Sequence, residues 1–325
     1  MVVSAGGVGA AGAGEAGSAG RGGATTQPQA GTGATSPAGT GGADVGEPTA
    51  GAGMGGHPDA AGGAPDAAGG AGGEPPVSDA CPNDPTKLEP GQCGCGVPES
   101  CTELKGGLAH RYSFNTAGSA AADTVGGANA TIVGTTASAG KLTFDGTAAA
   151  YLDLPNGKVS ALKDASFEIW LTWGGGSVWQ RIFDFGTNDK GEGNQGIGTK
   201  YLYLTPSEGA TGNVLWAAFS LNGVGAETVL RGSAPLPTGS VQHLVLVIDD
   251  TKNQARLYLN GSVAAVTGFA QSLSSLEDVN NWVGRSNFTD APFKGTVDEF
   301  RIYKVALTDA QVSASFGFGP NPAFL

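Results

Sequence analysis

The stretch Phe293–Val312, "FKGTVDEFRIYKVALTDAQV", joins the pattern of a β-strand to the pattern of a short helix. In "TVDEFRIY", branched and aromatic residues alternate with polar ones, as in a half-buried strand. Thr308 then stands as a helix N-cap and Gln311 completes a capping box, while Leu307 and Val312 occupy the positions of a hydrophobic staple. The stretch therefore predicts a strand followed at once by a helix, which is too short to be stable unless it packs on the domain.

This strand carries two adjacent acids, Asp298 and Glu299. Neighbouring side chains of a strand point to opposite faces, whereas a retaining glycosidase needs two carboxyls about 5–5.5 Å apart in one cleft. We therefore interpret the pair as structural. Alternation places Asp298 on the inward face with Phe300 and Ile302. It places Glu299 on the outward face, as a solvated partner of Arg301.

Alternating runs of this kind recur from about residue 106 onward, separated by turn signals about every 8–15 residues. The thirteen candidate strands are LAHRYSF, KLTFD, AAYLDL, SFEIWLTW, WQRIFDFG, KYLYLT, VLWAAFSL, ETVLRG, HLVLVID, QARLYLN, SVAAVTG, NWVGRS and TVDEFRIY. Asn260-Gly261 between two of these runs predicts a tight hairpin, because both central residues of a type I′ turn need positive φ. The rhythm predicts an all-β fold: a two-sheet antiparallel jelly-roll sandwich with one short C-terminal helix, spanning residues 106–325.

Seven segments of this region together resemble the laminin G-like, concanavalin A-type jelly rolls of bacterial secreted and surface proteins. They are GLAHRYSFN, DTVGGANATIVG, AYLDLPNG, SFEIWLTW, ARLYLNGS, WVGRS and FKGTVDEFRIYKVALTDAQV. The last segment is the most specific, and the resemblance covers about residues 107–315. It implies a sandwich whose members bind glycans, bind proteins or act as spacers, so the fold alone does not name a function.

Residues 1–80 have a different composition, with 25 Gly and 20 Ala and no Leu, Ile, Phe, Tyr or Trp. Such a segment buries too little apolar surface to offset roughly 1–2 kcal/mol per residue of ordering entropy. Its glycines keep no three-residue period, which excludes a collagen helix. We predict a disordered, flexible spacer of about 50 Å reach.

All four cysteines lie in "CPNDPTKLEPGQCGCGVPESC", as Cys81, Cys93, Cys95 and Cys101. An even number of cysteines among Pro and Gly predicts two disulfide bonds. Cys93 and Cys95 are too close to pair comfortably with each other, so two pairings stay open: 81–93 with 95–101, or 81–95 with 93–101. A zinc site is the rival interpretation, but the C-x-C spacing fits it poorly.

The same segment is similar to a short element found beside thrombospondin type 3-like calcium repeats in large bacterial surface proteins. The matching residues are Cys81-Pro82, Asp84-Pro85, Lys87, Pro90-Gly91 and Cys93-Gly94-Cys95-Gly96. The Asp-rich string that binds calcium in those repeats is missing. We therefore expect a stalk or hinge over residues 81–105 and no calcium there.

Charge and hydropathy exclude several kinds of partner. The net charge is −12 and no Lys/Arg cluster exists, which argues against nucleic acid and anionic membrane. No 18-residue apolar run is present, so we expect no membrane span. The opening "MVVSAGGVGA" lacks the basic and apolar regions of a signal peptide. Since the cysteine pattern fits an exported protein, we expect a signal or lipid-attachment cysteine upstream of Met1.

Catalysis is not expected from the remaining residues. Glu168 stands alone in its strand, without the alternate-position acids of laminarinase-like enzymes. The histidines His57, His110 and His243 are scattered, and no G-x-S-x-G elbow offers a nucleophile. We therefore predict a protein that is not an enzyme.

A metal site is one interpretation of the inward acids. The resemblance implies a calcium ion between the first loop and the last strand, held here by Asp123, Asn129 and Asp298. A buried salt bridge or hydrogen-bonded acid is the alternative, because a buried carboxylate needs a partner. Asp184 is a further inward acid, with Arg181 or Arg285 as its expected partner.

A sugar site needs an aromatic platform with polar side chains on loops around it. Of the tryptophans, Trp170 and Trp216 stand at strand centres and are expected in the core. Trp173 and Trp179 flank "GGGSV" and are expected nearer a rim. The predicted ligand-binding residues are Trp173, Trp179, Gln180, Arg181, Asn188, Asp189 and Asn194. The glycine-rich loop 186–198 is either a binding loop or a mobile connection.

The sequence thus predicts a non-catalytic extracellular or cell-surface recognition module that binds carbohydrate and is presented on a flexible spacer. The alternative is a structural or protein-adhesion module without a small-ligand site, and an enzyme with an unrecognised cleft is a third. The expected partner is a glycan or a cell-surface protein, the expected state is monomeric, and the expected cofactor is at most a structural calcium.

Overall fold

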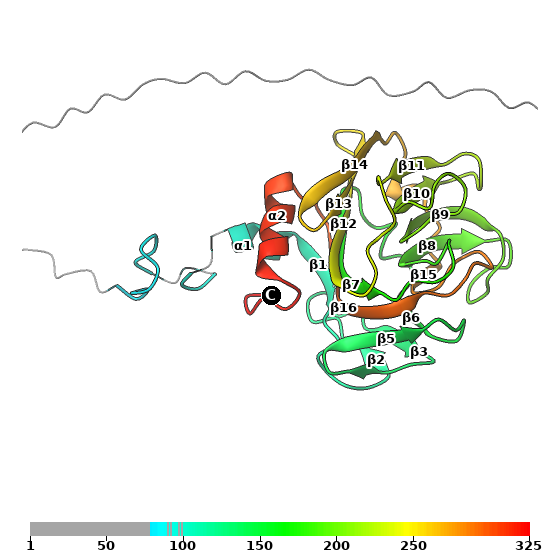
Figure 1. Ribbon diagram of the computed structural model, residues 1–325. Helices are drawn as coiled ribbons and strands as arrows, with labels where there is room; N and C mark the ends of the chain where they lie inside the picture. Colours follow the sequence, from blue (N-terminus) through cyan, green and yellow to red (C-terminus); the bar gives the residue numbers. More distant parts are fainter. Residues whose placement is uncertain (1–78, 90, 92, 97, 99) are drawn as a thin grey trace, which may run out of the picture. The chain divides into compact units, whose positions relative to one another are not determined.

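A computed structural model describes residues 79–89, 91, 93–96, 98 and 100–325, which all belong to one compact unit. The predicted spacer, except for Asp79 and Ala80, lies outside the described residues. Within them the chain forms sixteen strands, two α-helices and one 3-10 helix, against the thirteen strands and one helix expected (Figure 1). The all-β prediction is confirmed.

Two antiparallel sheets make up the sandwich. The first sheet has the order β14-β13-β12-β7-β16-β5-β4, and β1 also pairs with β16. Its strands are β1 Leu108–Tyr112, β4 Ala137–Ser138, β5 Lys141–Asp145, β7 Ala165–Trp173, β12 Val241–Asp249, β13 Gln254–Leu259, β14 Ser262–Gly268 and β16 Lys294–Tyr303. The second sheet has the order β11-β10-β9-β8-β15-β6-β3-β2. Its strands are β2 Ala120–Ala121, β3 Ala130–Val133, β6 Tyr151–Leu154, β8 Phe183–Asn188, β9 Gly198–Thr205, β10 Trp216–Ser220, β11 Thr228–Arg231 and β15 Asn280–Val283.

The core lies between the sheets and follows from the alternation of the strands. Phe167 of β7 lies 5.9 Å from Phe183 and 5.5 Å from Phe185 of β8, measured between ring centroids. The two β8 rings stack on each other and also approach Phe300 of β16. The predicted hairpin is confirmed, since Asn260 and Gly261 join β13 to β14 with φ of 50° and 77°.

The last strand, β16, breaks the expected alternation. Its pairing with β7 slips between Val297 and Glu299, and Val297 and Phe300 both contact the core. Asp298 is the extra residue of this β-bulge, so it does not simply share the face of Phe300. The prediction of a solvated Glu299 is wrong: its side chain is fully buried on the face away from the core.

Glu299 is buried because α2, Asp309–Phe318, and the residues after it lie against the outer face of the first sheet (Figure 1). Thr308 and Gln311 form the predicted capping box. Val312 and Leu307 are buried among apolar residues of β12, β13 and β16. A helix of this length gains its stability from that packing rather than from its own hydrogen bonds.

The sequence did not predict α1, Ser100–Gly107, which runs directly into β1. Gln311 of α2 donates to Glu103 of α1 over 2.8 Å. The structure pairs Cys81 with Cys95 and Cys93 with Cys101, one of the two pairings that the sequence left open. Cys101 lies within α1, so the second disulfide joins the cysteine-rich segment to that helix.

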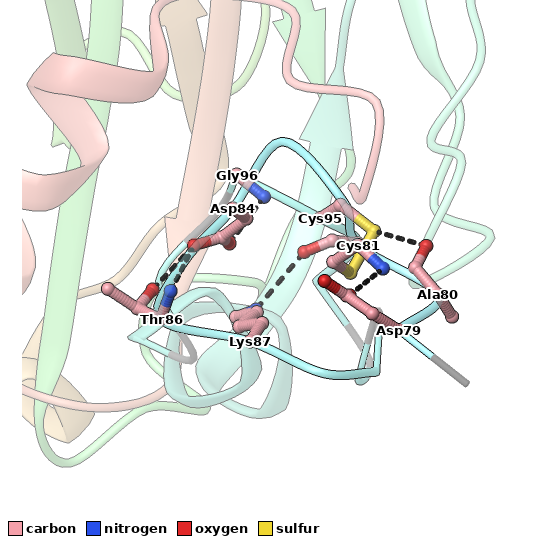
Figure 2. The surroundings of a disulfide bond; sticks show 9 residues. Asp79, Ala80, Cys81, Asp84, Thr86, Lys87, Cys95 and Gly96 are labelled. Carbon is pink, nitrogen blue, oxygen red and sulfur yellow. Dashed lines mark hydrogen bonds between the residues drawn. A yellow bond between two sulfur atoms is a disulfide. The ribbon is translucent and has the colours of Figure 1, made fainter. Parts of the chain in front are cut away.

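The cysteine-rich segment is also held by one carboxylate, as Figure 2 shows. Asp84 accepts hydrogen bonds from the backbone and the hydroxyl of Thr86 and from the backbone of Gly96. Lys87 donates to the carbonyl of Gly94. The Asp84 carboxylate therefore stabilises two turns of the cysteine-rich segment.

Candidate functional site

The outer face of the second sheet carries an aromatic cluster that is separate from the core. On β9, Leu202 and Leu204 point into the core, so the alternate residues Tyr201 and Tyr203 lie on the opposite face. Trp216 of β10 lies beside them. Partly buried side chains at the edge of this cluster, those of Trp179, Val214, Val229 and Phe288, complete it.

This cluster borders a pocket of about 350 Å³, which we call the outer pocket. Its lining residues are Trp179, Arg181, Tyr203, Ala210, Trp216, Val224, Glu227, Phe288 and Asp290. The volume lies near the lower end of the roughly 300–1,000 Å³ that is usual for ligand pockets. Four aromatic rings wall the pocket, and the charged groups are few.

Local backbone geometry places Trp179 at this wall. Its φ is 62°, in the left-handed region, and its N–H donates to the carbonyl of Ser207 over 2.8 Å. Gly209 passes so close that a Cβ there would lie 2.7 Å from the Trp179 Nε1. The glycine therefore lets the loop between β9 and β10 close over the indole.

Arg181 lies at the base of the outer pocket and is nearly buried, at 3% exposure. Its guanidinium carbon is 3.9 Å from the centroid of the Tyr203 ring. Its Nη2 lies 2.8 Å from Asp290 and its Nε 3.4 Å from Asp184, while Nη1 donates to the carbonyl of Trp179. Every nitrogen of the guanidinium thus faces an oxygen of the protein, which stabilises a buried cation.

The acids around this arginine differ in their surroundings. Burial raises the pKa of Asp184, and Arg181 together with hydrogen bonds from Asn287 opposes that rise. The predicted pairing of Asp184 with Arg181 is confirmed. At the pocket, Glu227 is half-buried and accepts a hydrogen bond from the Tyr201 hydroxyl over 2.7 Å.

The glycine-rich loop between β8 and β9 is anchored to the sheet at many points. Asn188 donates to the carbonyl of Asn194 and to the side chain of Asn287. Gln195 donates to two carbonyls of the segment after β15, and Gly193 donates to Asn280. The loop is therefore tied to β8 and to the segment around β15, and its Glu192 lines a second, polar pocket of about 330 Å³.

The seven predicted ligand-binding residues divide accordingly. Trp179 and Arg181 line the outer pocket. Trp173 belongs to the core, contrary to its expected place at a rim, and its indole donates to the buried Gln180. Asn188 is buried under the loop, whereas Asp189 and Asn194 are exposed and bond to neighbouring loop residues.

Five lining residues with polar or aromatic side chains were missed by the sequence: Tyr203, Trp216, Glu227, Phe288 and Asp290. Trp216 is buried, as expected, but outside the main core. The alternation of "KYLYLT" contained a usable signal, because both tyrosines fall on one face of that strand and the leucines on the other.

A second group of charged residues lies beneath α2 on the outer face of the first sheet. Arg301 contacts Glu168 at 3.2 Å and Glu299 at 2.8 Å, and all three side chains are fully buried. The pKa of Glu299 is raised by burial. Burial would also raise the pKa of Glu168, but Arg301 and His243 outweigh it and lower that pKa.

These buried residues include a serine, a histidine and an acid, yet they do not form a nucleophile and base. Ser315 donates to Glu168 over 2.6 Å, and the His243 Nε2 lies 2.7 Å from the same oxygen. The serine and histidine therefore both contact the carboxylate instead of each other. All three are sealed from solvent, so this arrangement, which we call the sealed network, is structural.

The first loop holds its acid with hydrogen bonds. Asp123 accepts from His110 and from four backbone N–H groups, those of Arg111, Val125, Gly126 and Ala128. Burial alone would raise its pKa, but the hydrogen bonds lower the pKa to about 2. Asn129 accepts from the Asp123 N–H, while Asp298 pairs with Lys141 at 2.8 Å.

Among the described residues, no group of three or more His, Cys, Asp or Glu side chains is placed to hold a metal ion. The oxygens of Asp123 already receive protein donors, and Asp298 contacts a lysine. As placed, these side chains do not present a calcium site, and calcium stays a prediction of the sequence alone. In the same part of the chain, no helix is long and apolar enough to cross a bilayer.

Three solved structures illustrate the similarity of the fold. Domain 4 of AbnA, an extracellular arabinanase from Geobacillus stearothermophilus in complex with arabinotriose, is 23% identical, with 63% of this chain and 96% of that chain covered and a TM-score of 0.48. The CBM40 of a Ruminococcus gnavus sialidase, bound to α2,3-sialyllactose, is 18% identical, with 53% and 97% covered and a TM-score of 0.41. A Trypanosoma rangeli sialidase is 16% identical, with 74% of this chain but only 36% of that chain covered and a TM-score of 0.51.

A search of curated proteins gives no significant match. The family model described as "Concanavalin A-like lectin/glucanases superfamily" matches residues 145–313, which is more than half of the chain. The two-sheet sandwich agrees with this match. The protein therefore belongs to the concanavalin A-like lectin/glucanase superfamily.

Proposed function

We propose that the protein is a non-catalytic carbohydrate-binding module and that the outer pocket is its sugar site. The observation that carries the proposal is the set of four aromatic rings, from Trp179, Tyr203, Trp216 and Phe288, around one solvent-open pocket. Aromatic faces give apolar contact area to the C–H face of a sugar ring, and nearby polar groups orient its hydroxyls. A family named for lectins and glucanases supports the same class of ligand.

Two carboxylates supply the polar groups. Glu227 accepts from Tyr201, and Asp290 accepts from Arg181 and Ser286. The second oxygen of each carboxylate receives no hydrogen bond from the described residues. Each can therefore accept a hydrogen bond from a sugar hydroxyl, and a hydrogen bond to a charged acceptor is stronger than one between neutral groups.

The non-catalytic part of the proposal rests on the position of Asp290, which contacts the guanidinium of Arg181. That carboxylate is already engaged by a cation of the protein, whereas a glycosidase uses a pair of carboxyl groups that flank the scissile bond, one of which donates a proton. Release of reducing ends from any bound polysaccharide would overturn this part.

The family and the two disulfides fit an extracellular location. In this setting, we propose that a monomeric domain meets glycans of a cell surface or matrix while residues 1–80 serve as its spacer. The same proposal includes a lipid anchor on the N-terminal side of this spacer.

A glycan array tests the sugar site directly. We expect the wild-type chain to bind at least one class of glycan, with calcium and with chelator, and Trp216→Ala to lose that binding. Lys304→Ala, a change at an exposed residue after β16, serves as the control. Binding that survives Trp216→Ala would show that the outer pocket is not the site.

Protein adhesion is the second candidate, and one observation favours it. The edge strand β14 exposes Val263 and Val266, at 46% and 51%. Exposed apolar side chains on a sheet edge can pair with another chain. If no glycan on the array is bound, and if the chain binds cell-envelope protein in a way that Val266→Lys abolishes, adhesion would be favoured over sugar binding.

A further inference from the structure

We infer that the outer pocket selects uncharged or amine-bearing glycans against carboxylated and sulfated ones, and that Glu227 determines this specificity. The inference rests on the proposed function, because it names the ligand class of the same pocket. It follows from the charges that line the pocket and from the partners that each charge already has.

The pocket contains one cation, and that cation is already paired. Arg181 contacts Asp290 and Asp184 and donates to the Trp179 carbonyl, and its planar face lies over Tyr203. Its 3% exposure leaves little of the guanidinium open to a ligand. An anionic sugar therefore finds no free cation among the lining residues.

The negative charges of the pocket are less completely paired. Two carboxylates, Glu227 and Asp290, line it against the single guanidinium, so the lining is net negative. Among the residues that the structure describes, the one hydrogen-bonding partner of Glu227 is a neutral tyrosine hydroxyl. A ligand carboxylate or sulfate brought into this apolar-walled pocket would meet that charge at short range. At a separation of about 6 Å and an effective dielectric constant of about 20, such repulsion weakens binding on the order of a hundredfold.

One further arginine lies near the rim. The Arg231 guanidinium is 5.2 Å from the centroid of the Trp216 ring, and it donates to the hydroxyl and the carbonyl of Thr211. It is not among the lining residues of the pocket. Because it is exposed, solvent and salt screen its charge, so we expect it to contribute little to ligand selection.

Ligand groups that donate hydrogen bonds, by contrast, match the carboxylate acceptors of the pocket. A hydroxyl or an ammonium group can donate to the second oxygen of Glu227, and the ammonium gains further from the aromatic faces. An amino sugar should therefore bind at least as well as its neutral counterpart. The selectivity predicted for the pocket is thus amine or neutral over acidic.

The test is an array whose glycans share a backbone and differ in charge: neutral chito-oligomers, their de-N-acetylated forms, and uronate, sulfated and sialylated oligomers. The strongest neutral or amine ligand is then titrated calorimetrically against wild type, Glu227→Gln and Glu277→Gln. Glu277 is an exposed acid paired with Lys200 outside the pocket, so its variant changes the same charge elsewhere. Thermal melts confirm that each variant is folded.

We expect the wild-type chain to bind neutral or amine glycans on the array and to bind no acidic ones. Glu227→Gln should weaken the binding of neutral or amine glycans roughly tenfold. It should also reduce the difference in affinity between these glycans and the acidic oligomers. Glu277→Gln should change neither quantity. Acidic glycans that bind wild type and are lost in Trp216→Ala would overturn the inference but leave the sugar site intact. An array with no bound glycan, or with binding indifferent to Trp216→Ala, would overturn the sugar site and the inference together.

Discussion

The two outer faces of the sandwich are built from similar residues but behave differently. Each carries a strand tryptophan and a buried arginine between acids: Trp170 with Arg301 on the first sheet, and Trp216 with Arg181 on the second. Trp170 stacks on Phe316 of α2 at 5.8 Å between centroids, whereas Trp216 borders a pocket. Residue type alone thus does not distinguish a structural face from the proposed binding face; the covering helix does.

The largest expected effect separates the two arginines. Arg301→Ala leaves Glu168 and Glu299 buried without their shared cation, so we expect the free energy of unfolding to fall by about 3–5 kcal/mol. Arg181→Ala should cost less, because water can enter from the outer pocket and solvate Asp184. Urea denaturation of both variants measures the difference. Equal losses would mean that α2 does not distinguish the two faces.

The two tryptophans give the next comparison. Trp170→Ala removes a ring packed against both His243 and Phe316, so we expect a loss of about 3–5 kcal/mol in the free energy of unfolding with glycan affinity retained. Trp216→Ala should cost clearly less stability and abolish binding. Melting curves and array binding of both proteins check this. Loss of binding in the Trp170 variant, with the fold intact, would contradict the assignment of the outer pocket.

One acid of each face, Glu168 on the first and Asp184 on the second, should also respond oppositely to pH. The lowered pKa of Glu168 adds stability that is present above its ordinary pKa of 4.5 and is lost as pH falls below it. The raised pKa of Asp184 adds stability that is present below its ordinary value of 3.8 and is lost as pH rises through the raised pKa. Urea denaturation from pH 3 to 7 should therefore show a steeper acid limb in Asp184→Asn and a flatter one in Glu168→Gln. The reverse pattern would refute the assignment.

The smallest expected effect concerns calcium at the first loop. Because donors of the protein already occupy the Asp123 oxygens and Lys141 pairs with Asp298, we expect the melting temperature to change by no more than about 1 °C between calcium and chelator. Asp123→Asn is the matched variant. A rise of several degrees in wild type that disappears in this variant would restore the calcium predicted from the sequence.

Much of the fold could be predicted because local rules agreed with the final structure. Strand alternation, the Asn260-Gly261 turn and the capping box at Thr308 each depend on residues close in sequence. The β-bulge at Asp298 depends instead on pairing with β7, and α1 depends on its contact with α2, so neither has a local signal. The prediction assumed strict alternation along this strand, and for that reason it wrongly placed Glu299 in solvent.

The candidate site was harder to predict for the same reason. Trp179 was expected near a rim because it flanks "GGGSV", and it lines the outer pocket together with Arg181. The others come together from separate parts of the chain: Glu227 follows β10 and Asp290 follows β15. Their proximity is a property of the sheet order, which no single stretch of sequence contains.

The seal that α2 forms over the first sheet has a consequence for valency. With that face covered, the described residues offer one aromatic pocket, so we expect each chain to bind one copy of the proposed ligand. Strong attachment would then come from many chains acting together, at an effective concentration set by their density and by the length of the predicted spacer, about 50 Å. Avidity would then depend more on the number of chains than on the affinity of a single pocket.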